Sequence, residues 1–228
     1  LSRGLGDVYK RQLGYDPSDI TLADGTKFDA AEKLRNAESS GNNGDAFRLL
    51  AYQQAPDYAD EQEARAVIER LLSAQTEDGG WSNDEVNGAD PDSTGAVLLG
   101  LAAYAAEDAA VKQAAEHAVQ YLSGQMLADG NIKSGYEENN YGTNANTSAM
   151  AILGLSALGI DVRNDMRFQA DDVSLWDGLL SFVSPSGDGF VYEYGEKQAD
   201  DMATKQAFLA VMAAERGENV FDFRRIKK

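Results

Sequence analysis

A unit of about fifty residues repeats along this 228-residue chain, and no other feature restricts the fold as strongly. Each copy contains a glycine turn such as Asp78–Trp81, a polar loop and a charge-poor apolar helix. The helices of successive copies begin at Asp92, Asn146 and Asp201, at intervals of 54 and 55 residues, and a degenerate earlier copy begins at Asp45. Repeated helical units of this length stack side by side, because one unit cannot bury its apolar face alone.

Two kinds of helix alternate within the repeat. Between Asp60 and Gln75 the apolar residues form one stripe, which is typical of a surface helix. The segment from Gly95 to Tyr104 has no charged residue, which indicates a helix buried on all sides. We expect outer helices near residues 27–38, 60–75, 107–125 and 172–183, and inner helices near 44–54, 92–105, 146–158 and 201–215. The two layers should run antiparallel, with the loops 76–91, 126–145 and 184–200 together at one end.

The first residues do not fit the repeat. Residues Leu1–Gln12 match no periodic pattern and resemble translated sequencing-adaptor remnants, so we exclude them from the fold. The next residues, Leu13–Asp16, have the same form as Leu158–Asp161, which follow a predicted inner helix. We therefore expect residues 13–228 to form one domain that is truncated at its N-terminus, with apolar surface uncovered where a preceding inner helix is missing.

The charge of the chain restricts its partners. The formal net charge is -18 and the pI is near 4.3, which argues against nucleic acid or an anionic membrane surface as a partner. The sequence lacks cysteine, so disulfides and thiolate metal sites are excluded. It also lacks an apolar run of about eighteen residues, so no transmembrane segment is expected.

Four motifs occur in an order that resembles one known superfamily. They are the turn Asp78–Trp81, the helix start Asp90–Gly95, the segment Leu158–Asp161 and the helix start Asp200–Ala207. Together they are similar to motifs of the α/α-toroid superfamily, which includes squalene and terpene cyclases, protein prenyltransferase β subunits and cobalamin-binding proteins related to transcobalamin. They most resemble its bacterial secreted or surface-attached branch, which carries prenyltransferase and squalene-oxidase repeats. The resemblance implies an all-α fold, an incomplete α6/α6-type barrel of antiparallel helical hairpins, and is compatible with both enzymes and binding proteins.

Asp90 and Asp92 are the candidate catalytic residues that the resemblance implies. Class II terpene cyclases protonate their substrate with the middle aspartate of a D-x-D-D motif. Here Asp90-Pro91-Asp92-Ser93 keeps two of the three acids, and Ser93 replaces the last one. Alternatively, Asp92 caps the helix N-terminus, as Asn146 would at the matching position. Because a neutral asparagine can cap a helix but cannot act as a strong acid, the recurrence favours the cap, with a lowered pKa for Asp92.

A metal site is not expected from the sequence. The resemblance implies zinc in protein prenyltransferases, which hold it with Asp, Cys and His, and this chain has no cysteine. His117 is the single histidine, and it lies on a predicted outer helix beside Glu116. A zinc site needs three or four converging donors, so we expect His117 to be a surface residue.

The loops before the inner helices carry aromatic and acidic residues that would share one rim of the barrel. These loops are longer than most helix connections, and such loops often bind ligands. The rim suits a neutral ring-bearing, sugar-like or cationic ligand. Alternatively, Trp81 is a structural staple and the loops are solvated. The candidate ligand-binding residues are Trp81, Asp92, Tyr136, Tyr141, Asn144, Asn146, Tyr192, Tyr194, Asp200 and Asp201.

The sequence favours a non-catalytic domain that binds a small molecule or a surface ligand, within an exported, extracellular or cell-surface bacterial protein. The resemblance to cobalamin carriers implies a corrinoid as one ligand, and no cofactor is required. Further domains are expected beyond this fragment. Two alternatives are an enzyme similar to terpene or squalene cyclases, with Asp92 as its acid, and a structural module of a larger surface protein. A cyclase should have an apolar aromatic cavity around a deep acid, whereas a binding protein should have polar and aromatic groups at the rim.

Overall fold

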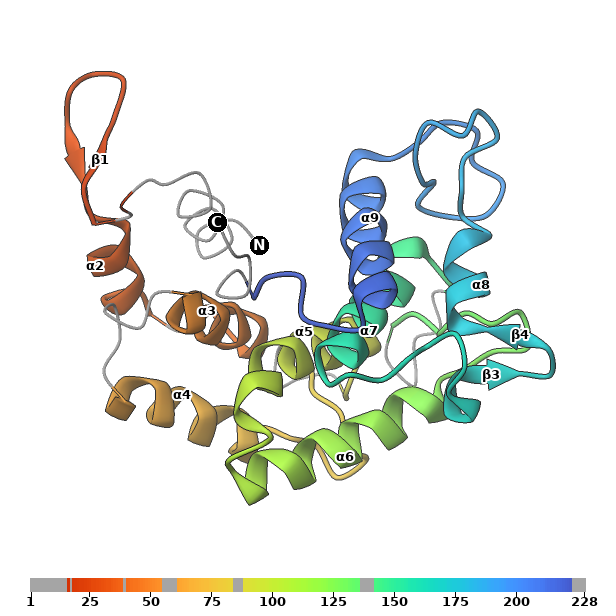
Figure 1. Ribbon diagram of the computed structural model, residues 1–228, viewed down its shortest axis with the longest axis horizontal. Coiled ribbons are helices and arrows are strands. Elements are labelled where there is room, and N and C mark those ends of the chain that lie inside the picture. The colour runs from red at the N-terminus through yellow and green to blue at the C-terminus, as the bar shows by residue number, and fades with distance from the viewer. Residues whose placement is uncertain are drawn as a thin grey trace.

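The computed structural model describes residues 16, 18–38, 40–54, 61–83, 88–135 and 142–222. Within these residues, four helices lie in a curved row (Figure 1). Neighbours in the row pack against each other, so that α5 contacts α3 and α7, and α7 contacts α9. The helices of the row are α3 (Asn42–Gln54), α5 (Pro91–Leu101), α7 (Ala145–Ala157) and α9 (Asp201–Arg216). This row is the inner layer that the apolar segments predict.

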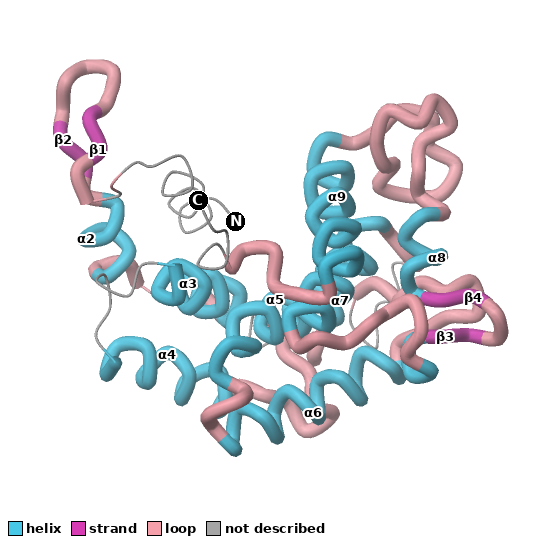
Figure 2. The backbone as a smooth tube through the Cα atoms, viewed as in Figure 1, coloured by secondary structure: helices cyan, strands magenta, loops and turns pink. Residues whose placement is uncertain are grey.

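A second layer of helices covers the outer side of the row. α4 (Glu61–Ser73) packs on α3, α6 (Ala109–Gly124) packs on α5, and the short α8 (Leu175–Leu180) packs on α7. Figure 2 shows that helices make up most of the described fold and that strands are confined to short hairpins. The fold class predicted from the repeat, an all-α toroid with inner and outer helices, is therefore confirmed.

The remaining elements are short. β1 (Ile20–Thr21) pairs with β2 (Lys27–Phe28), and β3 (Gln169–Ala170) pairs with β4 (Val173–Ser174), both in antiparallel hairpins. α2 (Ala30–Arg35) follows the first hairpin, and the 3-10 helices are η2 (Ala102–Tyr104) and η3 (Met166–Phe168).

The predicted outer helices at 27–38 and 172–183 are shorter than expected, because a capping side chain starts each of them later. Asp29 accepts a hydrogen bond of 2.8 Å from the backbone N–H of Glu32, so α2 begins after the hairpin strand. Ser174 and Asp177 form a reciprocal capping box at the start of α8. Apolar periodicity alone does not show these starts, since it continues into the preceding strands.

Small residues allow the inner helices to approach closely. A Cβ atom at Gly95 of α5 would overlap the carbonyl oxygen of Met150 on α7. On the other side of α5, a Cβ atom at Gly100 would lie 2.6 Å from the carbonyl oxygen of Ala46 on α3. Because protein interiors are close-packed, these contacts leave no room for a larger side chain. The glycine content of the inner helices is therefore a requirement of their packing.

The glycine-aromatic turns join the two layers. Trp81 is completely buried, and its indole N–H donates a 2.7 Å hydrogen bond to the carbonyl oxygen of Leu71 in α4. Its backbone pairs with Asp90 in an isolated β-bridge, directly before α5. The matching residues Ile132 and Phe190 also form isolated bridges within their own turns. Each turn thus anchors a loop that leads into an inner helix.

The inner row is an open arc, with α3 and α9 at its two ends (Figure 1). On α9 the side chain of Phe208 is 59% exposed. Residues 1–15, on which the adaptor prediction and much of the truncation prediction rest, lie outside the described residues, so both remain predictions. No helix in the described part of the chain is long and apolar enough to cross a membrane.

Candidate functional site

The N-terminal ends of the inner helices meet at one pocket with a cavity volume of about 400 Å³. Each of the four helices named above contributes its second residue and the residue one turn later. These pairs are Asn43 and Phe47 from α3, Asp92 and Ala96 from α5, Asn146 and Met150 from α7, and Met202 and Gln206 from α9; Ser40, Gly44 and Asn83 also line the pocket. Since the loops lead directly into these helix ends, their described parts lie at one end of the barrel, as predicted.

The helices α5, α7 and α9 are capped by the residues two positions before those that first enter the pocket. Asp90, Asn144 and Asp200 each accept hydrogen bonds of 2.8–2.9 Å from backbone N–H groups of the first helical turn. The prediction that Asp92 caps α5 is therefore wrong. Pro91 explains the difference, because proline is favoured at the first position of a helix, where its missing N–H costs nothing. The cap consequently falls on Asp90.

Asp92 is the one carboxylic acid among the described residues that line this pocket. It is partly buried, and burial raises its pKa from 3.8 to about 6. The Thr147 hydroxyl on α7 donates a 2.6 Å hydrogen bond to the carboxylate, which favours the ionised form, while the nearby charge of Asp90 favours the protonated form. Burial is the largest of these effects, so the predicted lowering of this pKa is also wrong.

Thr147 belongs to a buried network that reaches the next loop. Its hydroxyl oxygen lies 3.2 Å from that of Ser134, which accepts a 2.8 Å hydrogen bond from the side-chain amide of Asn144. Asn144, Thr147 and Ser134 are all buried. Because Asn144 also caps α7, the helix start, the loop and the Asp92 carboxylate are held in one arrangement.

Three side-chain amides in the pocket have an unpaired oxygen atom. Asn43 Oδ1, Asn146 Oδ1 and Gln206 Oε1 are shielded from solvent, and no group in the described part of the chain donates a hydrogen bond to them. Buried polar atoms in proteins are nearly always paired. A ligand in the pocket could pair with these amides where rotation of the side chain turns the oxygen or the NH₂ group toward it.

Two of the predicted rim residues point away from this pocket. Trp81 is completely buried and bonded to Leu71, so it does not reach a ligand. Asp201 is fully exposed and lies 4.0 Å from Lys205, one turn along the same helix.

The candidate tyrosines differ in their contacts and in their distance from the pocket. Tyr194 stacks on Phe182, with ring centroids 4.3 Å apart, and braces the loop before α9. Tyr192 lies closer to the pocket: burial raises its pKa, and the charge of Asp92 adds to this effect. Its carbonyl oxygen also accepts a hydrogen bond from the first residue of α7. Tyr136 and Tyr141 lie outside the described residues.

Several pocket residues were missed by the sequence analysis, namely Asn43, Phe47, Asn83, Met150, Met202 and Gln206. The signal that could have found most of them is the repeat itself. The second residue after each of these caps enters the pocket, but the predicted caps Asp92, Asn146 and Asp201 lie one or two residues after the observed ones. With the caps placed at Asp90, Asn144 and Asp200, the matching pocket positions become visible in the sequence.

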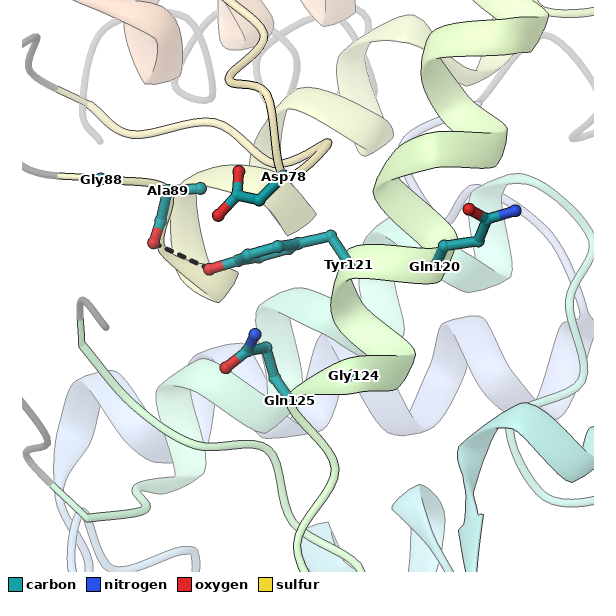
Figure 3. A pocket seen from close by; sticks show the side chains of 7 residues that line it. All are labelled: Asp78, Gly88, Ala89, Gln120, Tyr121, Gly124 and Gln125. Atoms are coloured by element: carbon teal, nitrogen blue, oxygen red, sulfur yellow. Dashed lines mark hydrogen bonds between the residues drawn. The ribbon is translucent and has the colours of Figure 1, made fainter. Parts of the chain in front are cut away.

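A second pocket of about 310 Å³ lies beside the outer helix α6 (Figure 3). Figure 3 shows Tyr121 of α6 directed at Ala89, whose carbonyl oxygen accepts a 2.8 Å hydrogen bond from the phenol. Asp78 is its acidic residue, and this carboxylate already accepts a hydrogen bond from the hydroxyl of Thr76. The lining residues are Asp78, Gly88, Ala89, Gln120, Tyr121, Gly124 and Gln125. Because Asp78 is exposed to solvent, whereas Asp92 is partly buried, this pocket is less suited to acid–base chemistry than the Asp92 pocket.

The described residues contain no group of three or more His, Cys, Asp or Glu side chains that could hold a metal ion. His117 lies on α6, and its backbone faces Gly79 of the turn. A Cβ atom at Gly79 would approach the carbonyl oxygen of His117 to 2.8 Å.

Similarity to known proteins is limited to the fold. No protein-family model and no curated protein sequence matches this chain. Similar solved structures include a polysaccharide lyase, with a TM-score of 0.55 and 16% identity, and a glycosyl hydrolase family 88 protein from Bacteroides vulgatus, with a TM-score of 0.53 and 15% identity. Each alignment covers 82% of this chain and 65% of the solved chain, so this chain spans just under two thirds of the length of those proteins. Neither structure belongs to the prenyltransferase and squalene-oxidase branch that the motifs resemble.

The predicted function needs correction. The sequence favoured a non-catalytic binding domain, whereas the two similar structures named above are a polysaccharide lyase and a glycosyl hydrolase. The described lining of the pocket mixes apolar side chains with the amides of Asn43, Asn83, Asn146 and Gln206, whereas a cyclase is expected to have an apolar aromatic cavity. The corrinoid ligand stays a prediction that no observation tests.

Proposed function

We propose that this protein is a carbohydrate-processing enzyme that hydrolyses glycosidic bonds, with Asp92 as the general acid. The observation that carries the proposal is a carboxyl group with a raised pKa, placed in the pocket where the inner helices meet. The names of the two similar structures, a polysaccharide lyase and a glycosyl hydrolase, support a carbohydrate as the substrate class.

The pKa of Asp92 suits proton donation near neutral pH. A general acid is most effective when its pKa lies close to the working pH. An aspartate with the ordinary pKa of 3.8 is almost fully ionised at pH 6, whereas Asp92, with a pKa of about 6, keeps about half of its molecules protonated there. Burial at the helix ends therefore supplies the proton donor that the reaction needs.

The reaction can be written with Asp92 as the only acid–base group. Protonated Asp92 gives its proton to the glycosidic oxygen as the bond from that oxygen to the anomeric carbon breaks. Water then adds to the anomeric carbon, and the proton that it releases returns to the Asp92 carboxylate. One water molecule is consumed and two sugar fragments leave. Thr147 holds one carboxylate oxygen in place throughout.

The pocket fits a sugar in size and in chemistry. Its volume of about 400 Å³ lies within the range of small-molecule sites. Side-chain amides both donate and accept hydrogen bonds, so Asn43, Asn146 and Gln206 can bind sugar hydroxyl groups. Phe47 and Met150 add apolar surface for the carbon face of a sugar ring.

The proposal is tested by incubating the protein with a panel of soluble polysaccharides and measuring the release of reducing ends. Asp92→Asn keeps the shape of the side chain and removes its titrating proton. Glu116→Gln, on the exposed face of α6, is the matched control, since it also replaces one carboxylate by an amide. Circular dichroism checks that each variant is folded.

We expect cleavage of at least one polysaccharide by the wild-type protein and by Glu116→Gln, with a loss of about 100-fold or more in Asp92→Asn. Equal activity in all three proteins, or no cleavage of any polysaccharide, would contradict the proposal.

A further inference from the structure

We infer that the pocket selects an uncharged, hydroxyl-rich sugar unit and excludes a uronate, an inference that rests on the proposed function. The inference starts from the three unpaired amide oxygens of Asn43, Asn146 and Gln206, which share the pocket with the Asp92 carboxylate. The carboxylate accepts hydrogen bonds, and each amide can accept or donate one, depending on its rotation. A ligand that pairs with all four groups must therefore supply both donors and acceptors.

Sugar hydroxyl groups meet this requirement and carboxylates do not. A hydroxyl group donates one hydrogen bond and accepts others, whereas an ionised carboxylate only accepts. Rotation of a side-chain amide exchanges its oxygen and its NH₂ group, and a hydroxyl group can pair with either one. The ring of polar groups at the four helix ends is thus matched to a neutral sugar with several free hydroxyls.

The charges around the pocket also favour an uncharged sugar. None of the described residues that line the pocket is a lysine or an arginine. A uronate carboxylate would lie near ionised Asp92 with no cation among these described lining residues to balance it, and in a partly buried site this repulsion is stronger than in water. The net charge of -18 on the whole chain adds a repulsive field for any acidic glycan.

Helix dipoles oppose this repulsion, because helix N-termini attract anions. Each N-terminus carries the equivalent of roughly half a positive charge. Asp90 and Asp200 cap two of these helix ends and place a full negative charge on each of them. The caps therefore outweigh the dipoles at these ends, and Asp92 adds a further negative charge when it is ionised.

A preference for an uncharged sugar also favours hydrolysis over elimination. Elimination from a sugar removes a proton next to a carboxyl group, which acidifies that proton. An uncharged sugar has no such carboxyl group. The reaction that fits the pocket therefore uses water to break the glycosidic bond.

The test is calorimetric binding at about pH 7.5 to three matched pairs of tetrasaccharides, built from glucose, galactose or mannose and from the corresponding uronic acids. We expect the neutral member of at least one pair to bind at least about tenfold more tightly than its uronate, since like charges repel strongly in such a site. Methyl esterification of that uronate removes its charge and should recover part of the affinity. Tighter binding of a uronate in any pair, or binding in none, overturns the inference.

Variants show whether the amides supply the selectivity. Asn146→Leu and Gln206→Met should each weaken neutral-sugar binding about fivefold, the effect of losing one hydrogen bond. Gln113→Met, which removes an exposed amide from α6, is the control and should bind as the wild type does. Unchanged binding in both pocket variants overturns the inference.

The outcomes separate this inference from the proposed function. If the protein cleaves a uronate oligosaccharide and Asp92→Asn does not, the enzyme proposal stands and the inference fails. If neutral sugars bind as expected but none is cleaved, the enzyme proposal fails and the binding preference stands.

Discussion

The hydroxyl group of Thr147 on α7 donates a 2.6 Å hydrogen bond to the carboxylate of Asp92 on α5. This contact joins two neighbouring repeats across the pocket and favours the ionised form of Asp92, against the larger opposing effect of burial. The pKa of the candidate acid is therefore set by the packing of two helices and not by its own helix alone.

Thr147→Val should raise the pKa of Asp92 further. The substitution keeps the shape of a buried side chain and removes the donor, so the ionised carboxylate loses a stabilising partner. A rise of about one pKa unit is expected from the loss of one hydrogen bond to a charged group. Titration of the Asp92 carboxyl carbon by nuclear magnetic resonance measures it. Thr147→Ser retains the hydroxyl and should titrate as the wild type does; a shift of the same size in both variants would exclude the hydrogen bond as its cause.

The free energy of unfolding of Asp92→Asn should rise relative to that of the wild type as the pH rises. The folded pKa of about 6 lies above the unfolded value of 3.8, so the folded protein binds the proton more tightly, and the stability that this provides is lost as the pH rises through 6. Asparagine does not ionise and escapes this loss. Its advantage over the wild type should grow by up to about 3 kcal/mol between about pH 4 and about pH 8.

Urea unfolding across this pH range measures the effect, with Glu116→Gln as the exposed control. A pH-independent difference between Asp92→Asn and the wild type would show that Asp92 does not titrate with a raised pKa.

Substitutions can distinguish the residue that caps a helix from the residue next to it. Asp200→Ala removes the acceptor for two backbone N–H groups of α9 and should lower the free energy of unfolding by about 1 kcal/mol, whereas Asp200→Asn should cost little, because asparagine caps about as well. Asp201→Ala is the control, since that side chain is fully exposed. Equal losses for Asp200→Ala and Asp201→Ala in thermal or urea unfolding would refute the assignment of the cap.

Gly95→Ala should destabilise the inner layer. Its Cβ atom would overlap the backbone of Met150, so α5 and α7 would have to separate, at a cost of about 1–3 kcal/mol. Gly124→Ala, at the end of α6, has open space around the added atom and should be neutral or slightly stabilising. Urea unfolding compares the two variants. Similar free energies of unfolding would mean that the inner helices are not packed as closely as described.

The fold was largely predictable because the repeat, the alternation of helix types and the charge-free inner segments all depend on burial. Burial leaves a periodic pattern in the sequence, and that pattern placed all four inner helices. The ends of the outer helix predicted at 172–183 differ from those of α8, and the two hairpins were not predicted, because capping side chains such as Ser174 decide those boundaries locally.

The site was less predictable. Asp92 and Asn146 are both among the candidate residues predicted from the sequence, but the interpretation that they cap their helices is wrong, since Asp90 caps α5 and Asn144 caps α7. The residue two positions after the cap lies in the pocket. Burial there raises the pKa of Asp92, whereas a capping position would lower it. Gln206 was missed because nothing in its local sequence distinguishes it from a surface glutamine; only the meeting of four helix ends places it in the pocket.

The most direct test of the central claim is the pH dependence of polysaccharide cleavage by the wild-type protein and Asp92→Asn, followed by the release of reducing ends. Because the protonated form of Asp92 is the proposed donor, we expect the wild-type rate to fall as the pH rises above about 6, and Asp92→Asn to be inactive throughout. Cleavage by Asp92→Asn with the wild-type rate and pH profile would contradict the claim.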